Sequence, residues 1–205
     1  MDTVAFVELL TILAIGVITP GPNGLTCFAH SGMYGPKSNI KLILGMIIGF
    51  VIIELGVGLT VDAIKDNTTA MVVLHYVGML FLGLMVFAMF RIDPTNFSNE
   101  NIDSVLGIKT GVSMQFANGK EWAFVVLIMS EFIEPFGGGI AGILTIISMT
   151  LAVCIAAMVC WTLIGSRLHG VFSDDKKGPI IFKVCGSLLF LLWVVLLMRG
   201  PVTAA

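Results

Sequence analysis

The chain has 205 residues, of which 57% are hydrophobic and only 12% are charged. Its mean hydropathy of +1.02 is typical of proteins that cross a membrane several times, and it excludes an ordinary water-soluble domain. The formal net charge is −2 and no basic cluster follows the pattern of a phosphate-binding surface, so the sequence indicates no nucleic-acid partner.

Six apolar segments have the length that a membrane crossing requires, which is about 20 residues for a helix. Short polar connectors separate them. The segments cover about residues 4–29, 40–61, 69–90, 106–131, 139–165 and 180–199. The sequence therefore predicts an all-α integral membrane protein with six transmembrane helices in a single transporter domain, residues 1–205, in contact with membrane lipid.

The first apolar segment is interrupted by Pro20, Gly21, Pro22 and Asn23. Proline lacks a backbone N–H and clashes with the preceding helical turn. In hydrocarbon the freed backbone groups need partners in protein or in a watery cavity. We therefore expect the first transmembrane helix to be broken here, and the break to lie at a substrate site.

The fourth apolar segment has a matching polar interruption, formed by Asn118, Gly119, Lys120 and Glu121 and followed by Trp122. A charge near the bilayer centre costs about 2.5–3.5 kcal/mol even on a lenient scale. Lys120 is therefore the first candidate for a functional residue, holding a substrate carboxylate or neutralising an acid in one transport state. A structural ion pair with Glu121, or a snorkelling side chain, is the alternative.

The remaining residues of the two interruptions are candidates for substrate binding through amide groups or through shape. Asn23 and Asn118 can donate and accept hydrogen bonds, so each can bind substrate or satisfy the opened backbone of its own helix. Pro20, Gly21 and Pro22 create the N-terminus of a half-helix, and its partial positive charge suits a carboxylate.

Two ionisable residues at similar depth are candidates for proton coupling. Glu54 in the second segment and His75 in the third lie roughly 7–12 Å from the same end of their helices, counted by helical rise. A buried carboxyl and an imidazole can carry a proton between them, while a buried carboxyl paired to a neighbour is the structural alternative for Glu54. We expect Glu8, Glu131 and Glu134, which lie near the interface, to be solvated.

A weak internal repeat relates the third and sixth segments. Gly78 and Gly186 align at a common offset, as do the arginines that end the two segments. Three crossings per half give the halves opposite topology, which is a recurrent plan in transporters. The predicted inverted repeats are about 1–91 and 104–200, joined by a linker at about 92–103.

Basic residues are distributed unevenly between the two sides of the predicted bundle. The first, third and fifth connectors and their edges hold Lys37, Lys41, Arg91, Lys109, Arg167, Lys176, Lys177 and Lys183, whereas the opposite side holds only Lys65 and Arg199. Because cytoplasmic loops are enriched in Lys and Arg, we expect both termini to lie outside the cytoplasm.

With these features the chain resembles the LysE/RhtB family of amino-acid exporters. The resemblance covers nearly the whole chain and rests on Pro20-Gly21-Pro22-Asn23, on Gly32, Gly35, Lys37, Gly45 and Gly49, and on Asn118-Gly119-Lys120-Glu121-Trp122. With Trp122, the second motif resembles that of the cysteine and O-acetylserine exporter branch more than that of the lysine branch. Gly119 stands where the family usually has proline, and Glu121 where it often has alanine.

The resemblance implies a secondary transporter in the cytoplasmic (inner) membrane that exports small neutral amino acids or derivatives similar to cysteine, O-acetylserine or homoserine. We expect a zwitterionic substrate, proton-coupled antiport by alternating access, no cofactor and no enzymatic activity. A divalent-metal transporter and a thiol–disulfide redox carrier are the alternatives. The pairs Gly45/Gly49 and Gly138/Gly142 are small-xxx-small patterns, which are typical of contacts between membrane helices, either within one chain or in a homodimer. The four cysteines, expected to be buried apolar residues, are Cys27, Cys154, Cys160 and Cys185.

Overall fold

A computed structural model describes residues 3–19, 21–91, 105–172 and 177–201, and in these residues the chain contains α-helices and no strands. The elements are α1 (Thr3–Ile18), α2 (Pro22–Tyr34), the short 3₁₀ helix η1 (Pro36–Ser38), α3 (Asn39–Ile64), α4 (Thr68–Arg91), α5 (Ile108–Ala117), α6 (Gly119–Phe132), α7 (Gly139–Phe172) and α8 (Lys177–Arg199). The predicted all-α class is confirmed. The predicted linker at about 92–103 lies outside the described residues.

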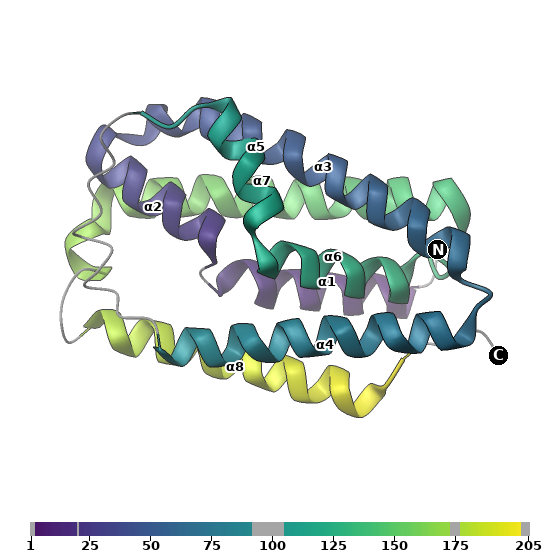
Figure 1. Ribbon diagram of the computed structural model, residues 1–205. Helices are drawn as coiled ribbons and strands as arrows, with labels where there is room; N and C mark the ends of the chain where they lie inside the picture. Colours follow the sequence, from purple (N-terminus) through teal and green to yellow (C-terminus); the bar gives the residue numbers. More distant parts are fainter. Residues whose placement is uncertain (1–2, 20, 92–104, 173–176, 202–205) are drawn as a thin grey trace.

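The helices lie alongside one another in an elongated bundle (Figure 1). The start of α1 and the end of α8 lie at one end of the bundle, where α3 also passes into α4 and α6 into α7; we call it the terminal end. The opposite end holds the turn from α2 to α3 and the end of α4 (Figure 1). Successive passes along the bundle therefore alternate in direction.

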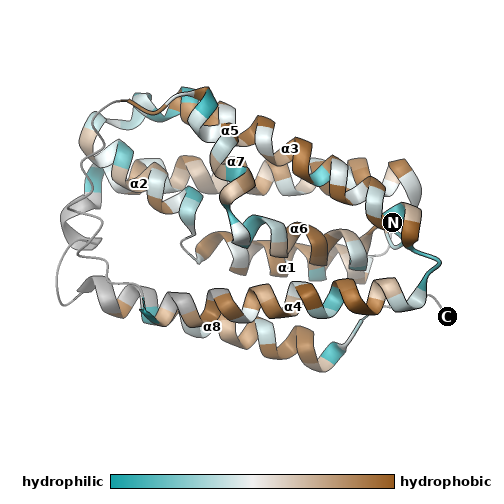
Figure 2. Cartoon of the chain, in the orientation of Figure 1, coloured by the Kyte–Doolittle hydropathy of each residue, from teal (hydrophilic) through white to brown (hydrophobic). Residues whose placement is uncertain are grey.

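The helices of the bundle consist largely of hydrophobic residues (Figure 2). Large hydrophobic side chains such as Val4, Leu80 and Met198 are exposed, which in water would be unfavourable over so wide an area. Among the described residues, Pro36–Ile64 and Gly139–Arg167 are each long and apolar enough to span a membrane, and α1 with α2 makes a third such span if the broken pair is counted as one. The helices are thus suited to hydrocarbon surroundings.

Both sequence-predicted interruptions are breaks in the helices. α1 ends at Ile18 and α2 begins at Pro22, preceded by Gly21 in an extended conformation; Pro20 lies outside the described residues. Asn118 is also extended (φ −84°, ψ 91°) and separates α5 from α6. The second break forms without a proline because the Asn118 side chain accepts a hydrogen bond from the Glu121 N–H and so caps α6.

Two glycines allow the backbones of α3 and α5 to touch. A Cβ atom on Gly45 would collide with the carbonyl oxygen of Ile108, and one on Gly111 would collide with that of Leu42. Close approach through small residues is the usual packing mode of membrane helices. The interpretation of Gly45 as a helix-contact residue is confirmed within one chain, and this contact fixes α5 against α3 before the break at Asn118.

Two helices are longer than the sequence predicted. The first apolar segment was expected to end near residue 29 and the fifth near residue 165, but α2 continues to Tyr34 and α7 to Phe172. Hydropathy marks the length of chain that hydrocarbon can cover, whereas helical hydrogen bonds continue into the polar interface. The bundle therefore extends beyond its apolar belt at the end opposite the termini.

Candidate functional site

The two helix breaks face one another across a small cavity of about 90 Å³. Side chains and backbone from α1, α2, α3, α5, α6 and α7 line it, most of them apolar. Its main polar side chains are Asn23, Glu54, Gln115, Asn118, Lys120 and Glu121. The cavity is far smaller than a pocket for a drug-sized ligand, which has roughly 300–1,000 Å³, so it suits water molecules or a very small metabolite.

Lys120 connects the second break to the first. Its ammonium Nζ donates to the carbonyl oxygens of Gly16 and Thr19, both at 2.6 Å, and to Thr19 Oγ1 at 2.9 Å. The break leaves the last carbonyls of α1 without helical partners, and a cation is favourable at this negative end of the helix. The Lys120 stem passes directly beside Gly21, where an added Cβ would lie 2.8 Å from Lys120 Cδ.

These contacts differ from both structural interpretations of Lys120. The described residues contain no ion pair between Lys120 and Glu121, and the side chain is buried (9% exposed) instead of snorkelling. An ammonium group has three donors, and all three have acceptors at the end of α1. A substrate carboxylate would therefore have to replace one of those acceptors to bind Lys120 directly.

An amide and carboxylate network joins α2 to the second break. Asn23 and Gln115 exchange two hydrogen bonds of 2.9 Å each. Glu121 Oε2 accepts from Asn23 Nδ2 at 3.3 Å and from Asn118 Nδ2 at 3.2 Å. Sequence analysis did not select Gln115, although a glutamine three residues before Asn118 in an apolar run was an available signal.

Glu54 lies in the same cavity and is almost fully buried, with 1% exposure. Its Oε2 accepts a hydrogen bond of 3.0 Å from Thr150 Oγ1 on α7. The cavity thus contains two carboxyl groups and one ammonium group, and the ammonium is held by α1. The polar atoms facing the cavity are therefore best suited to a cationic group.

Three of the predicted substrate-binding residues, Pro22, Gly119 and Trp122, do not line this cavity. Pro22 is exposed at the first turn of α2, and Gly119 is exposed at the start of α6. Trp122 is 36% exposed and donates from Nε1 to the Phe116 carbonyl at 3.1 Å. Pro20 lies outside the described residues.

Trp161 of α7 also lines the cavity. Its Nε1 donates to the Val17 carbonyl near the end of α1 at 3.2 Å. The indole packs so closely on Gly24 that an added Cβ there would lie 2.9 Å from Trp161 Cδ1. Trp161 lies in an apolar run, whereas Trp122 directly follows the polar interruption, so the local sequence did not mark Trp161 as a cavity residue.

Glu54 and His75 do not contact one another. Glu54 bonds Thr150, whereas His75 Nδ1 lies 3.1 Å from Glu131 Oε1, and His75 does not line the cavity. The expectation that Glu131 is solvated is wrong, since its side chain is 3% exposed. α4 and α6 pack against each other, and this tertiary contact covers a carboxyl group that its position near the helix end had suggested to be wet.

The described residues contain no group of three or more His, Cys, Asp and Glu side chains that could hold a metal ion. All four cysteines are free thiols. Cys27 and Cys185 are buried as expected, but Cys160 is exposed, which corrects the interpretation of all four as buried residues. Cys160 does not line the cavity.

Apolar helices that can span a membrane, together with a small cavity that holds charged and amide side chains between broken helices, define a membrane-embedded transport protein. The sequence model of the LysE type translocator family matches residues 14–200, and the chain therefore belongs to this family. The resemblance seen in the sequence is confirmed. Members of this family are translocators and efflux proteins, not enzymes.

Curated relatives share low identity over most of their length. The chain is 22% identical over 164 residues to the cysteine/O-acetylserine efflux protein of Klebsiella pneumoniae subsp. pneumoniae, covering 80% of this chain and 83% of that protein. The proteins of the same name from Salmonella choleraesuis and Escherichia coli O1:K1 / APEC are 20% and 21% identical, each covering 79% of this chain and 83% of the relative. No solved structure shows a significant match.

Proposed function

We propose that this chain is a secondary exporter of small neutral amino acids or their derivatives, similar to cysteine, O-acetylserine or homoserine, in the cytoplasmic (inner) membrane. The observation that carries the proposal is the small charged cavity at the meeting point of two broken helices. The curated relatives named as cysteine/O-acetylserine efflux proteins support the substrate class.

The proposed architecture is six transmembrane spans in two inverted halves, about 1–91 and 104–200. Each half begins with a broken helix and continues with two unbroken helices. The excess of Lys and Arg in the first, third and fifth connectors supports an orientation with both termini outside the cytoplasm. A reporter fused after Ala205 tests the orientation, and reporter activity in the cytoplasm would contradict it.

A zwitterionic substrate fits the polar groups of the cavity by charge. Its ammonium group would bind the carboxyl groups of Glu54 and Glu121 and the side-chain carbonyl of Asn23. Its carboxylate would lie at the N-terminus of α2, near Gly21, where the helix carries a partial positive charge. In this proposal Lys120 holds the end of α1 in place and so shapes the site.

Proton antiport follows if one carboxyl group binds either a proton or the substrate ammonium, but not both. Glu54 is the proposed group, because it is buried in the cavity and accepts its hydrogen bond from the neutral Thr150. Ionisable side chains inside membrane segments are typical of proton relays. Protons would then move inward and substrate would move outward in alternate steps of the transport cycle.

Efflux from loaded proteoliposomes tests the proposed function directly. We expect cysteine, O-acetylserine and homoserine to leave the vesicles when a proton gradient is imposed, and to raise the melting temperature of the purified chain by binding its folded state. Lysine serves as the comparison with an extra charge. If none of the small neutral amino acids is exported or stabilises the chain, the proposal fails.

Gly21→Ala should reduce export several-fold. The added Cβ would lie 2.8 Å from Lys120 Cδ, so the Lys120 stem must shift and weaken its bonds to the end of α1. Gly56→Ala is the matched control, since a Cβ at Gly56 meets nothing within 4 Å. The measurement is the efflux rate of each variant. Equal rates for Gly21→Ala and Gly56→Ala would contradict the close contact between Gly21 and Lys120.

A further inference from the structure

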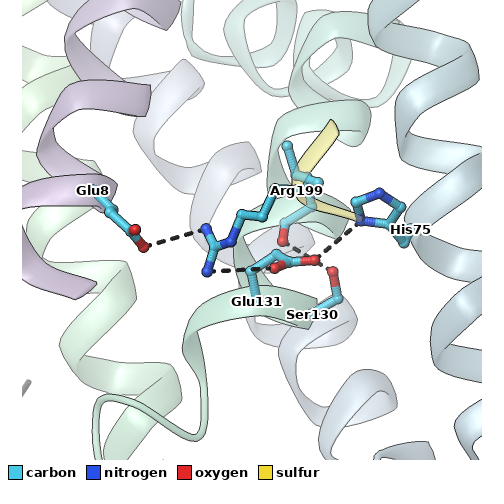
Figure 3. Close-up of polar contacts among 6 residues, drawn as sticks. Glu8, His75, Ser130, Glu131 and Arg199 are labelled. Atoms are coloured by element: carbon cyan, nitrogen blue, oxygen red, sulfur yellow. Dashed lines mark hydrogen bonds and ion pairs between the residues drawn. The ribbon is translucent and has the colours of Figure 1, made fainter. Parts of the chain in front are cut away.

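A second polar cluster lies at the terminal end of the bundle and joins four helices (Figure 3). Glu131 of α6 occupies its centre. Its Oε1 lies 3.1 Å from His75 Nδ1 of α4, and its Oε2 lies 3.9 Å from Arg199 Nη2 of α8. Arg199 Nη1 in turn pairs with Glu8 Oε2 of α1 at 3.2 Å. We call these four residues the terminal cluster.

The terminal cluster runs from the core of the bundle to its surface. The side chains of His75 and Glu131 are 2% and 3% exposed, whereas those of Arg199 and Glu8 are 33% and 41% exposed. None of the four lines the cavity. Glu131 follows Lys120 by about three turns of α6, roughly 16 Å by helical rise, so the cluster lies between the cavity and the terminal end.

The two ring nitrogens of His75 have unequal surroundings in this arrangement. Nδ1 faces a carboxylate oxygen and therefore carries the proton, while Nε2 is buried without a hydrogen-bond partner among the described residues. Protonation would add a second N–H with no acceptor, and an unsatisfied buried donor costs roughly 1–3 kcal/mol. An arrangement in which water reaches Nε2 would supply the acceptor that this second N–H needs.

Two further groups lie beside His75 or beside its carboxylate partner. The Tyr76 ring meets the imidazole edge-on, with centroids 5.3 Å apart. Glu131 would attract an imidazolium, but it also faces the cationic Arg199, which Glu8 holds in place. A protonated His75 would place a second cation on the other oxygen of this carboxylate, and the two cations would repel each other. A proton on His75 thus weakens the contact that ties α8, and through Glu8 also α1, to α6.

We propose that the terminal cluster is the gate that closes the path from the cavity to the terminal end, and that a proton bound at His75 opens it. The inference rests on the proposed transport function. A proton shifts an equilibrium towards the state that binds it more tightly, and here that is the state in which water enters the cluster. The gate would open for substrate release on the side where protons are taken up.

Hydrogen–deuterium exchange of the purified full chain, without substrate, tests the gate. After correction for intrinsic chemical exchange, residues 3–10 and 192–199 should exchange at least about fivefold faster at about pH 5.5 than at about pH 7.5, the range in which histidine changes charge. Residues 139–148 at the start of α7 contain no cluster residue and should show no such change.

Variants identify the groups responsible. His75→Gln keeps a donor for Glu131 but cannot take a proton, so the pH dependence should disappear. Arg199→Gln should give fast exchange at both pH values. Lys65→Gln is the matched control, because it breaks the exposed Lys65–Glu134 pair of 2.8 Å and should change nothing. If Arg199→Gln does not fold, Glu8→Gln should give the same increase for residues 3–10.

The gate is refuted by pH-independent exchange in the unmodified chain, by pH-dependent exchange that persists in His75→Gln, or by unchanged protection in the arginine or Glu8 variants. These outcomes are independent of substrate. If exchange depends on pH but the chain exports no amino acid, the gate is supported and the proposed function is contradicted. If the chain exports amino acids but exchange does not depend on pH, the proposed function is supported and the gate is contradicted.

Discussion

Lys120→Met should abolish export and destabilise the folded chain. The change removes the cation from the end of α1 and leaves the acceptors of Gly16 and Thr19 without donors. Each buried acceptor left unsatisfied costs roughly 1–3 kcal/mol, so the total loss should be about 3 kcal/mol or more. Lys120→Arg should also impair export, because the planar guanidinium does not fit the slot beside Gly21. Efflux rates and melting temperatures are the measurements.

A pair of threonine variants separates a role at α1 from a role in substrate contact. Thr19→Val removes one of the three acceptors of Lys120 and should reproduce part of the loss in stability. Thr11→Val is the control, since Thr11 makes the same kind of hydrogen bond to its own helix but is exposed. An unchanged melting temperature in Thr19→Val would contradict the structural role.

The ion-pair account of Lys120 makes a different prediction. If Lys120 only neutralised Glu121, then Lys120→Ala combined with Glu121→Ala should recover both folding and export. Because the acceptors of Lys120 lie on α1, we expect the double change to recover neither. Full recovery by the double variant would restore the ion-pair interpretation.

Glu121→Gln should raise the KM for export roughly tenfold to a hundredfold, with little change in melting temperature. The amide keeps the size of the side chain and one oxygen acceptor for Asn23 or Asn118. It removes the charge proposed to bind the substrate ammonium, and a hydrogen bond to a charged group contributes roughly 1.5–3 kcal/mol. Transport rates over a range of substrate concentrations give the KM.

Glu134→Gln provides the matched control for this measurement. Glu134 is an exposed carboxylate at the terminal end, paired with Lys65 at 2.8 Å, and its neutral variant should leave the KM unchanged. If Glu121→Gln also leaves the KM unchanged, Glu121 does not bind the substrate. If the melting temperature falls sharply instead, Glu121 serves mainly to hold the two breaks together.

The two helix breaks could be predicted from the sequence, because the residues that cause them act on the neighbouring backbone. Pro22 and Asn118 act on their own backbone, one through a missing N–H and the other through a side chain that caps the next helix. Asn23, Lys120 and Glu121 were also found, because polar groups in an apolar run are costly wherever the run packs. These features need no knowledge of the neighbouring helices.

The sequence by itself determined that the chain is helical, apolar and twice interrupted, since these properties depend on residues close together in the chain. Only the tertiary structure decided what the polar groups contact. Lys120 reaches α1 across about a hundred residues, and Gln115 pairs with Asn23 over a similar separation. Trp122 faces outward while Trp161 lines the cavity, and Glu131 is buried against α4. Which face of a membrane helix is covered depends on the helix beside it, and hydropathy along one segment carries no information about that neighbour.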